Sequence, residues 1–156
     1  MSSVVETARQ AWGAEIPDWE EAAQLSANES GFLTAPGMFS CKKIDQGSAA
    51  LAPFLTDLKG RGADFGAGWG WMSKQALLAD AVTALDLFEA DFYALEAAKQ
   101  NLNDSRATYH WADVANLPKQ RDPYDFIISN PPFHQTRKAE PDLGKAFIFR
   151  IFAKLV

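Results

Sequence analysis

The stretch that decides the fold is Asp64-Phe65-Gly66-Ala67-Gly68-Trp69-Gly70. Its three glycines stand at every second position, which is typical of a loop whose backbone approaches a ligand closely, because a side chain there would occupy the ligand's place. Glycine also tolerates the positive φ angles of a sharp turn between a strand and a helix. The residues that follow, 71–78, predict a helix whose first N–H groups point back at the loop. The stretch therefore predicts a strand, a ligand-binding turn and a helix.

The spacing of the glycines indicates the class of ligand. It is GxGxG, whereas dinucleotide-binding proteins have GxGxxG, and Trp71 occupies the place of their third glycine. This difference favours S-adenosylmethionine (SAM) over NAD as the cofactor. The cofactor-binding residues predicted in this stretch are Asp64, Gly66, Ala67, Gly68 and Gly70. For the glycine motif taken alone, a tight turn without a ligand is the alternative.

Strand and helix patterns alternate along the chain on both sides of this loop. Strands are predicted at 63–65, 81–89, 109–113 and 125–129. Helices are predicted at 49–58, with Pro53 bending or shortening the helix, at 71–78, at 91–102 and from about Leu143 onward. This alternation predicts an α/β fold with a Rossmann-like, doubly wound, mainly parallel sheet, whose ligands lie at the carboxyl ends of the strands.

The N-terminal part has a different pattern. Two short helical patterns, 4–12 and 19–25, predict a helical extension over 1–30, and the remaining residues, 31–156, form the predicted SAM-binding domain. Between them, Pro36-Gly37 predicts a turn that exposes Met38 and Phe39 on a loop.

Three polar residues follow the later strands and are expected at the same edge of the sheet as the glycine loop. Glu89 ends the second strand and is our favoured acceptor for the ribose hydroxyls of the cofactor, while Asp86, which lies closer to the interior of that strand, is the alternative. Asp113 follows the third strand and either holds the adenine or caps the turn that comes next. Asn130 follows the fourth strand and is expected to reach the cofactor as well.

Asn130-Pro131-Pro132-Phe133 is the strongest signal in the chain. Two successive prolines fix φ and remove two N–H donors, which leaves carbonyls free to accept hydrogen bonds. The Asn130 side-chain oxygen and the Pro131 carbonyl can both accept from one exocyclic NH₂ group and direct its nitrogen lone pair toward an electrophile. Phe133 offers a flat face on which a flipped base can stack. The alternative is a Pro-Pro stop at the end of a strand.

Composition limits the remaining possibilities. The 156 residues, 47% hydrophobic and 12% aromatic, suit one globular domain with a sizeable core. The single Cys41 cannot form an internal disulfide, and no run of about 18 apolar residues is present, so we expect a cytoplasmic protein. A net charge of −5 argues against general affinity for nucleic acid, although 134–156 carry five bases and only two acids.

Taken together, these motifs resemble the class I SAM-dependent methyltransferases of the "methyltransferase small" family, and within it bacterial rRNA guanine-N2 methyltransferases are the most similar. The resemblance covers about residue 32 to the C-terminus. It rests on Phe39, the run 44–48, the glycine loop, the 89–101 pattern and Ser129-Asn130-Pro131-Pro132-Phe133-His134.

The resemblance implies roles for individual residues. Asn130 and Pro131 orient the target amine, and Phe133 stacks on the base, so these three are the predicted catalytic residues. Glu89 binds the ribose, and Phe39 and His134 join Phe133 in binding the substrate. The implied reaction is direct methyl transfer from SAM to an exocyclic base amine of RNA, guanine N2 of rRNA in the first place, driven by positioning and without a metal.

Two alternatives stay open at this stage. One is methylation of another amine, adenine N6 or a protein glutamine amide, and the other is a catalytically silent module that binds SAM or RNA. In the family the sheet continues beyond the helix that ends here at Val156, so the domain is expected to be incomplete at its C-terminus. A sheet edge left uncovered in this way would favour a homodimer.

Overall fold

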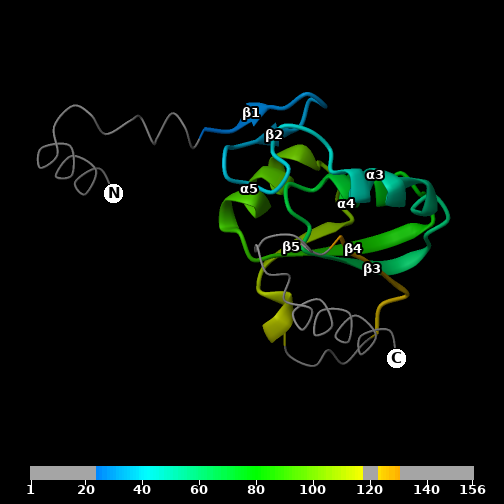
Figure 1. Ribbon diagram of the computed structural model, residues 1–156. Coiled ribbons are helices and arrows are strands. Elements are labelled where there is room, and N and C mark those ends of the chain that lie inside the picture. The colour runs from blue at the N-terminus through cyan, green and yellow to red at the C-terminus, as the bar shows by residue number, and fades with distance from the viewer. Residues whose placement is uncertain (1–23, 118–122, 131–156) are drawn as a thin grey trace, which may run out of the picture.

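The computed structural model describes residues 24–117 and 123–130 and has the predicted α/β fold (Figure 1). Its centre is a parallel four-stranded sheet in the order β5-β4-β3-β6. The strands are β3 (Gly60–Phe65), β4 (Val82–Glu89), β5 (Ala107–Trp111) and β6 (Phe126–Ile128). The chain thus adds β4 and β5 on one side of β3 and β6 on the other. The carboxyl ends of β3 and β6 therefore flank the point at which the strand order reverses, where ligands bind in sheets of this type.

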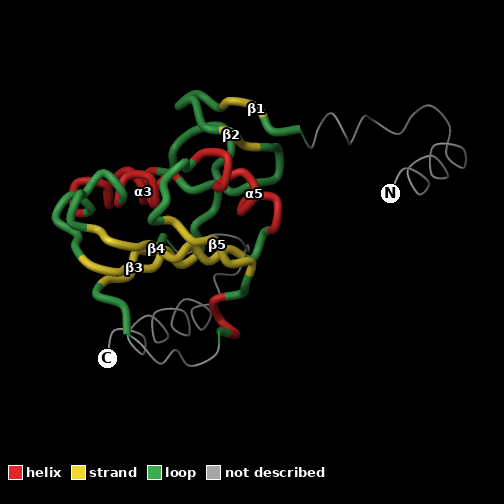
Figure 2. The backbone as a smooth tube through the Cα atoms, turned by 180° about the vertical axis from the view of Figure 1, so that it is seen from behind, coloured by secondary structure: helices red, strands yellow, loops and turns green. Residues whose placement is uncertain are grey.

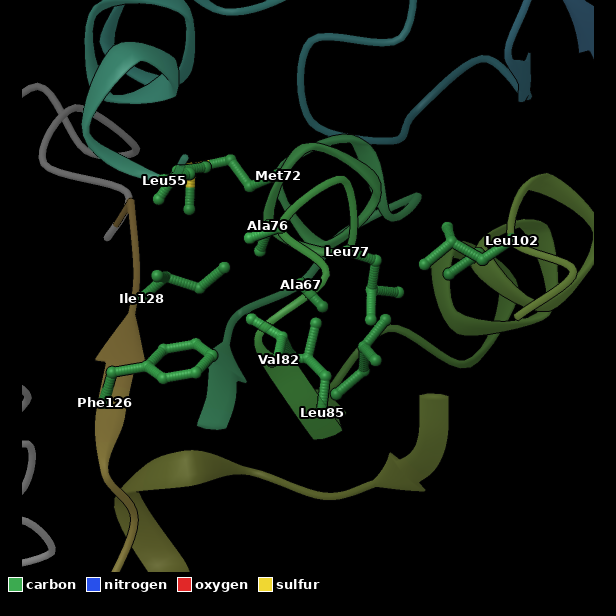
Figure 3. Packing of buried hydrophobic residues seen from close by; sticks show 13 residues of the cluster. Leu55, Ala67, Met72, Ala76, Leu77, Val82, Leu85, Leu102, Phe126 and Ile128 are labelled. Atoms are coloured by element: carbon green, nitrogen blue, oxygen red, sulfur yellow. The ribbon is translucent and has the colours of Figure 1, made fainter. Parts of the chain in front are cut away.

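Three α-helices lie on one face of the sheet, as the two opposite views of Figures 1 and 2 agree. They are α3 (Gln46–Leu51), α4 (Trp71–Ala76) and α5 (Phe92–Asn101). Between them and the sheet lies an apolar cluster, in which Leu85 and Leu87 of β4 are fully buried. Phe126 and Ile128 project into the same cluster from β6, and Met72 and Ala76 reach it from α4 (Figure 3).

The first strand is longer than its sequence predicts. It begins at Gly60 and not at Ala63, although Gly60, Arg61 and Gly62 give no apolar pattern. Gly62 has no apolar side chain of its own, but the ring of Phe126 in the neighbouring strand β6 occupies the space that a Cβ at Gly62 would need. Gly62 and Phe126 are partners in the β3–β6 ladder, so the missing side chain is replaced by a neighbour 64 positions later in the chain.

The helix predicted over 49–58 is wrong in both of its bounds. Asp45 caps α3 by accepting a hydrogen bond from the Ser48 N–H at 3.1 Å, so the helix begins at Gln46. It ends at Leu51, and a short 3₁₀ helix, η1 (Ala52–Phe54), follows with Pro53 in its first turn. Proline is tolerated there because its missing N–H has no helical partner to lose.

A small antiparallel hairpin precedes the main sheet. It consists of β1 (Ser26–Ala27) and β2 (Leu33–Thr34), so residues 24–30 of the predicted extension are not helical. Asn101 at the end of α5 fixes the hairpin, because its side chain bonds both the N–H and the carbonyl of Leu33, at 2.8 and 2.9 Å. The helices expected before residue 24 and after Leu143 lie outside the described residues.

Within 24–117 and 123–130, no helix has the length and apolar character needed to cross a membrane.

Candidate functional site

A pocket lies at the carboxyl ends of β3 and β6, where the sequence places the glycine loop and Asn130. Six of the residues singled out in the sequence line it: Phe39, Asp64, Gly66, Ala67, Gly68 and Asn130. Seven more lining residues were not predicted: Ser40, Ile44, Asp45, Ser48, Trp69, Trp71 and Met72. Segments that are 91 positions apart in the chain, from 39 to 130, thus meet in one pocket.

The glycine loop leaves open space on its ligand side. Gly66 and Gly68 have φ angles of 76° and 55°, and a Cβ added at either position would meet nothing within 4 Å. The loop is fixed from behind, because the N–H groups of Gly66 and Ala67 donate to the Phe88 carbonyl at 2.9 and 3.1 Å. Open space at these two positions allows a ligand to approach the backbone of the loop closely.

Gly70 has a different reason to be glycine. It starts α4 with a φ of 89° and is absent from the pocket lining, although it was predicted among the cofactor-binding residues. A Cβ there would contact the side chain of Leu102 and come within 3.1 Å of the Ala98 Cβ. The third glycine of the motif therefore permits α4 to start directly beside α5.

Glu89 closes the loop from the β4 side. One carboxylate oxygen accepts from the Gly68 N–H at 2.8 Å, and the other accepts from the Asp91 N–H at 2.8 Å. Both bonds are to backbone groups, and a carboxylate has lone pairs left for further donors. Glu89 therefore contacts the glycine loop, and its role toward the cofactor stays a prediction.

Asp86 points to the opposite face of the sheet. It accepts from Arg61 at 2.6 Å and from the Tyr124 hydroxyl at 2.9 Å, and its second oxygen lies 2.9 Å from His110 Nε2. Burial raises the pKa of this carboxyl, but the hydrogen bonds from His110, Tyr124 and Arg61 outweigh burial and leave the pKa below its usual value. Of the two acids on β4, Glu89 bonds the glycine loop and Asp86 bonds residues on the opposite face, and neither is among the residues that line the pocket.

Asp64 is the most unusual acid of the pocket. It has no exposed surface, and one of its oxygens accepts from the Ser73 hydroxyl at 2.6 Å. Its other oxygen, Oδ1, has no hydrogen-bond partner among the described residues. Burial is the main cause that raises the pKa of this carboxyl to about 7, and the negative charge of Glu89 adds to it.

Asp113 caps the turn after β5. Its two oxygens accept from the Ala115 N–H at 2.8 Å and from the Asn116 side chain at 2.7 Å, at the start of η2 (Val114–Asn116). These bonds are those of the capping role that the sequence left open as an alternative. Asp113 is not among the residues that line the pocket.

Asn130 is held by α3 across the pocket. Its side-chain nitrogen donates to the Asp45 carboxylate at 2.8 Å and to the Ser48 hydroxyl at 2.9 Å. The neighbouring Ser129 donates to the Phe65 carbonyl at 2.6 Å and so joins the end of β6 to the end of β3. The other residues expected here, Pro131, Phe133 and His134, lie outside the described residues.

The loop with Phe39 differs from its prediction in one residue. Phe39 is half-exposed at the pocket, and its carbonyl accepts from Trp69 Nε1 at 3.0 Å. Met38 was expected to be exposed beside it, but it is buried in a second apolar cluster with Trp69 and Ala94. The turn at Pro36-Gly37 brings this apolar side chain back onto α5, where it is removed from water.

The pocket residues that sequence reasoning missed come mostly from α3 and its cap. The run 44–48 was part of the motif behind the resemblance, but Asp45 and Ser48 received no role in the site. The only local signal was an Asp three residues before a Ser, which is an ordinary capping pattern. Within 24–117 and 123–130, no three His, Cys, Asp or Glu side chains gather where they could hold a metal ion.

The family model of the Methyltransferase small domain matches residues 29–155, which include the glycine loop, Glu89 and Asn130. The chain belongs to this family. Its parallel sheet with helices is the Rossmann-like fold of class I methyltransferases.

Individual relatives agree with this assignment. Ribosomal RNA small subunit methyltransferase C of Idiomarina loihiensis is 32% identical over 126 residues, which are 80% of this chain and 37% of that protein. The protein of the same name from Shewanella sediminis is 29% identical over 95% of this chain and 43% of its own length. The chain therefore spans less than half the length of these curated relatives.

Among solved structures, the chain is similar to a 16S rRNA N2 methyltransferase from T. thermophilus, in complex with AdoMet and guanosine. The two superpose with a TM-score of 0.66 at 25% identity, over 83% of this chain and 38% of that one.

Proposed function

We propose that this chain is the catalytic part of an enzyme that transfers a methyl group from SAM to the exocyclic N2 of guanine in ribosomal RNA. The observation that carries the proposal is the meeting of Asn130 and the glycine loop in one pocket. A residue suited to orient an amine then lies beside a loop suited to hold the methyl donor. The names of the relatives support the choice of ribosomal RNA and of guanine N2.

The pocket residues, together with Glu89, which contacts the glycine loop but is not among the residues that line the pocket, offer groups that match the parts of SAM. The open backbone at Gly66 and Gly68 would accommodate the methionine end, and Glu89 would accept from the ribose hydroxyls with its remaining lone pairs. Asp64 Oδ1, which is buried and has no partner among the described residues, would accept from the ammonium group of the methionine end.

The bound cofactor would supply a methyl group on a sulfonium sulfur, which is electrophilic enough to need no metal. Asn130 would accept a hydrogen bond from the guanine NH₂ and turn the nitrogen lone pair toward that methyl group. A new N–C bond would form as the S–C bond of the donor breaks, and the methylated amine would lose a proton to water. Catalysis of this kind rests on positioning, which is worth several kcal/mol for well-oriented partners.

Three described aromatic residues line the pocket, Phe39, Trp69 and Trp71, and Phe39 is the most exposed of them, at 48%. It offers a surface on which a base could stack, a role that the sequence also assigns to Phe133. We therefore place the flipped guanine between Asn130 and the loop of Phe39. Ribosomal RNA as substrate agrees with the cytoplasmic location expected from the sequence.

The test has two parts, binding and transfer. Isothermal titration with SAM should give a saturable heat, and tritiated methyl groups from SAM should appear in 16S rRNA as N2-methylguanosine after digestion to nucleosides. Label in N6-methyladenosine or in protein would select one of the alternative amines. Binding without transfer would indicate the silent module, and absence of SAM binding would contradict the proposal.

The homodimer expected from the sheet edges stays a prediction. Light scattering at micromolar concentration checks it, and a stable monomer would contradict it.

A further inference from the structure

The two hydrogens of the Asn130 amide are both used within the protein. One points to the Asp45 carboxylate at 2.8 Å and the other to the Ser48 hydroxyl at 2.9 Å, and both partners come from the first turn of α3. The orientation of this amide follows from chemistry, because an ionised carboxylate can only accept hydrogen bonds. If the amide turned over, its oxygen would face the carboxylate, and two acceptors would repel each other.

The carboxyl group of Asp45 is ionised at neutral pH. Burial raises the pKa of this carboxyl, but hydrogen bonds from the Ser48 N–H and from Asn130 outweigh burial, and the pKa lies below its usual value. A negative charge on the nitrogen side of the Asn130 amide polarises the amide and strengthens its oxygen as an acceptor. The amide oxygen is then suited to an amine that becomes positive as it is methylated.

Gly47 makes room for this arrangement. A Cβ at Gly47 would come within 2.9 Å of an Asp45 carboxylate oxygen and within 3.1 Å of Asn130 Oδ1. Real Cβ atoms seldom come so close to other atoms, so any side chain at Gly47 would displace the pair. Glycine is costly inside a helix, and here the cost coincides with the contact between α3 and Asn130.

We propose that Asp45 and Ser48 are positioning residues, which hold the Asn130 amide with its oxygen toward the substrate amine. The inference rests on the proposed function for the reaction itself. The orientation of the amide, however, is a property of the protein alone and can be measured without substrate.

Substitutions on α3 separate this role from a role in folding. Asp45 also caps α3, so we choose Asp45→Ser, because serine is a good N-cap but its oxygen lies one bond closer to the backbone and does not span to Asn130. Asp45→Asn keeps an oxygen at the right distance for both contacts and serves as the conservative rescue. Ser48→Ala removes one contact of the amide and leaves the cap, which uses the Ser48 backbone N–H.

The value of kcat should depend on the contacts with Asn130 and not on the stability of α3. In Ser48→Ala and Asp45→Ser we expect kcat for methyl transfer to fall about tenfold or more, since a misplaced polar group at the reacting centre is costly. SAM affinity, KM for RNA and the melting temperature should stay close to those of the parent, and Asp45→Asn should recover most of kcat. Ser105→Ala, in an exposed turn before β5, is the matched control and should behave as the parent.

Gly47→Ala gives an independent test with the opposite effect on the helix. Alanine favours a helix over glycine, so the melting temperature should stay the same or rise. The added Cβ displaces the Asp45 and Asn130 side chains, so kcat should fall. A variant that is at least as stable as the parent and as active would count against the role of this contact.

A spectroscopic arm keeps the proposal testable even if the parent transfers no methyl group. The side-chain NH₂ signals of Asn130 in a ¹H–¹⁵N spectrum are assigned by their loss in Asn130→Ala. Two hydrogen bonds should protect these protons from exchange with water, and Ser48→Ala and Asp45→Ser should abolish the protection. Full activity in both variants, or unchanged exchange of the Asn130 amide, would overturn the inference. An inactive parent with a protected amide would instead refute the proposed function alone.

Discussion

Asp64 and Asp86 are buried carboxylates on neighbouring strands, and they differ in the face of the sheet to which they point, in their hydrogen-bond partners and in the direction of their pKa shifts. The β3–β4 ladder pairs Ala63 with Asp86 and Asp64 with Leu87, so the two side chains point to opposite faces of the sheet. Asp86 has three partners, one of them the cation of Arg61, and its pKa is lowered. Asp64 lines the pocket, has one hydroxyl partner and one oxygen without a partner among the described residues, and burial raises its pKa to about 7.

The difference in hydrogen-bond partners indicates that Asp86 stabilises the fold, whereas Asp64 has an oxygen that can accept from a ligand. A buried acid with all of its oxygens bonded gains nothing from a further partner. A buried acid with an unpaired oxygen costs stability until something donates to it. Among the described residues, the pocket face therefore contains one buried oxygen without a partner, Asp64 Oδ1, while both oxygens of Asp86 on the other face are bonded.

The largest effect on the pocket side should come from Asn130→Ala. Losing one positioned acceptor in a dry site typically costs about 3–4 kcal/mol at the transition state, so the rate of methyl transfer should fall by roughly 10² to 10³. SAM affinity should remain nearly unchanged, because the amide acts on the substrate. Single-turnover assays and SAM titration measure the two quantities, and normal turnover would reduce Asn130-Pro131 to a stop at the end of β6.

On the other face, Asp86→Ala should weaken the fold and leave the cofactor site intact. Its removal leaves Arg61 and Tyr124 without their carboxylate, which should lower the free energy of unfolding by about 2–4 kcal/mol. Arg61 is partly exposed, so water replaces some of what it loses. Urea denaturation measures the change, and Asp57→Ala, at an exposed position, is the control.

Glu89→Ala sharpens the comparison between the two acids of β4. It should lower SAM affinity about ten- to a hundredfold, since hydrogen bonds to a charged group are worth about 1.5–3 kcal/mol. The same titration with Asp86→Ala should give the parent's affinity. If binding is unchanged in Glu89→Ala and lost in Asp86→Ala, the ribose role passes to Asp86.

The smallest effect concerns the pH dependence of stability. The unfolded chain loses the Asp64 proton near the usual value of 3.8, whereas the folded protein keeps it up to about 7. The folded state therefore binds more protons in this window, and stability falls as pH rises. From about pH 6 to about pH 8 the loss should be about 1.4 kcal/mol.

Asp64→Asn should remove this dependence, because its amide does not titrate. Denaturation midpoints at the two pH values measure the effect in the absence of SAM. An equal fall of stability in the parent and in Asp64→Asn would mean that another group titrates there.

The sequence by itself determined the local features of this protein. The alternation of apolar strands with helices predicted the sheet, since each pattern reflects the period of its own backbone. The glycine spacing predicted the open loop after β3, because Gly66 and Gly68 need positive φ whatever surrounds them. The family followed from short motifs of the same local kind, and the catalytic role of Asn130 that these motifs predict stays a prediction.

The tertiary structure alone decided which groups face which. The Phe126 ring fills the space beside Gly62 in β3, and Met38 is buried in a cluster with Trp69 and Ala94. From the sequence alone Asp45 is recognised only as a helix cap, and the structure shows that it also bonds Asn130, 85 positions later. Contacts of this range leave no periodic trace in the chain, because their partners are selected by the packing of the whole sheet and not by neighbouring residues.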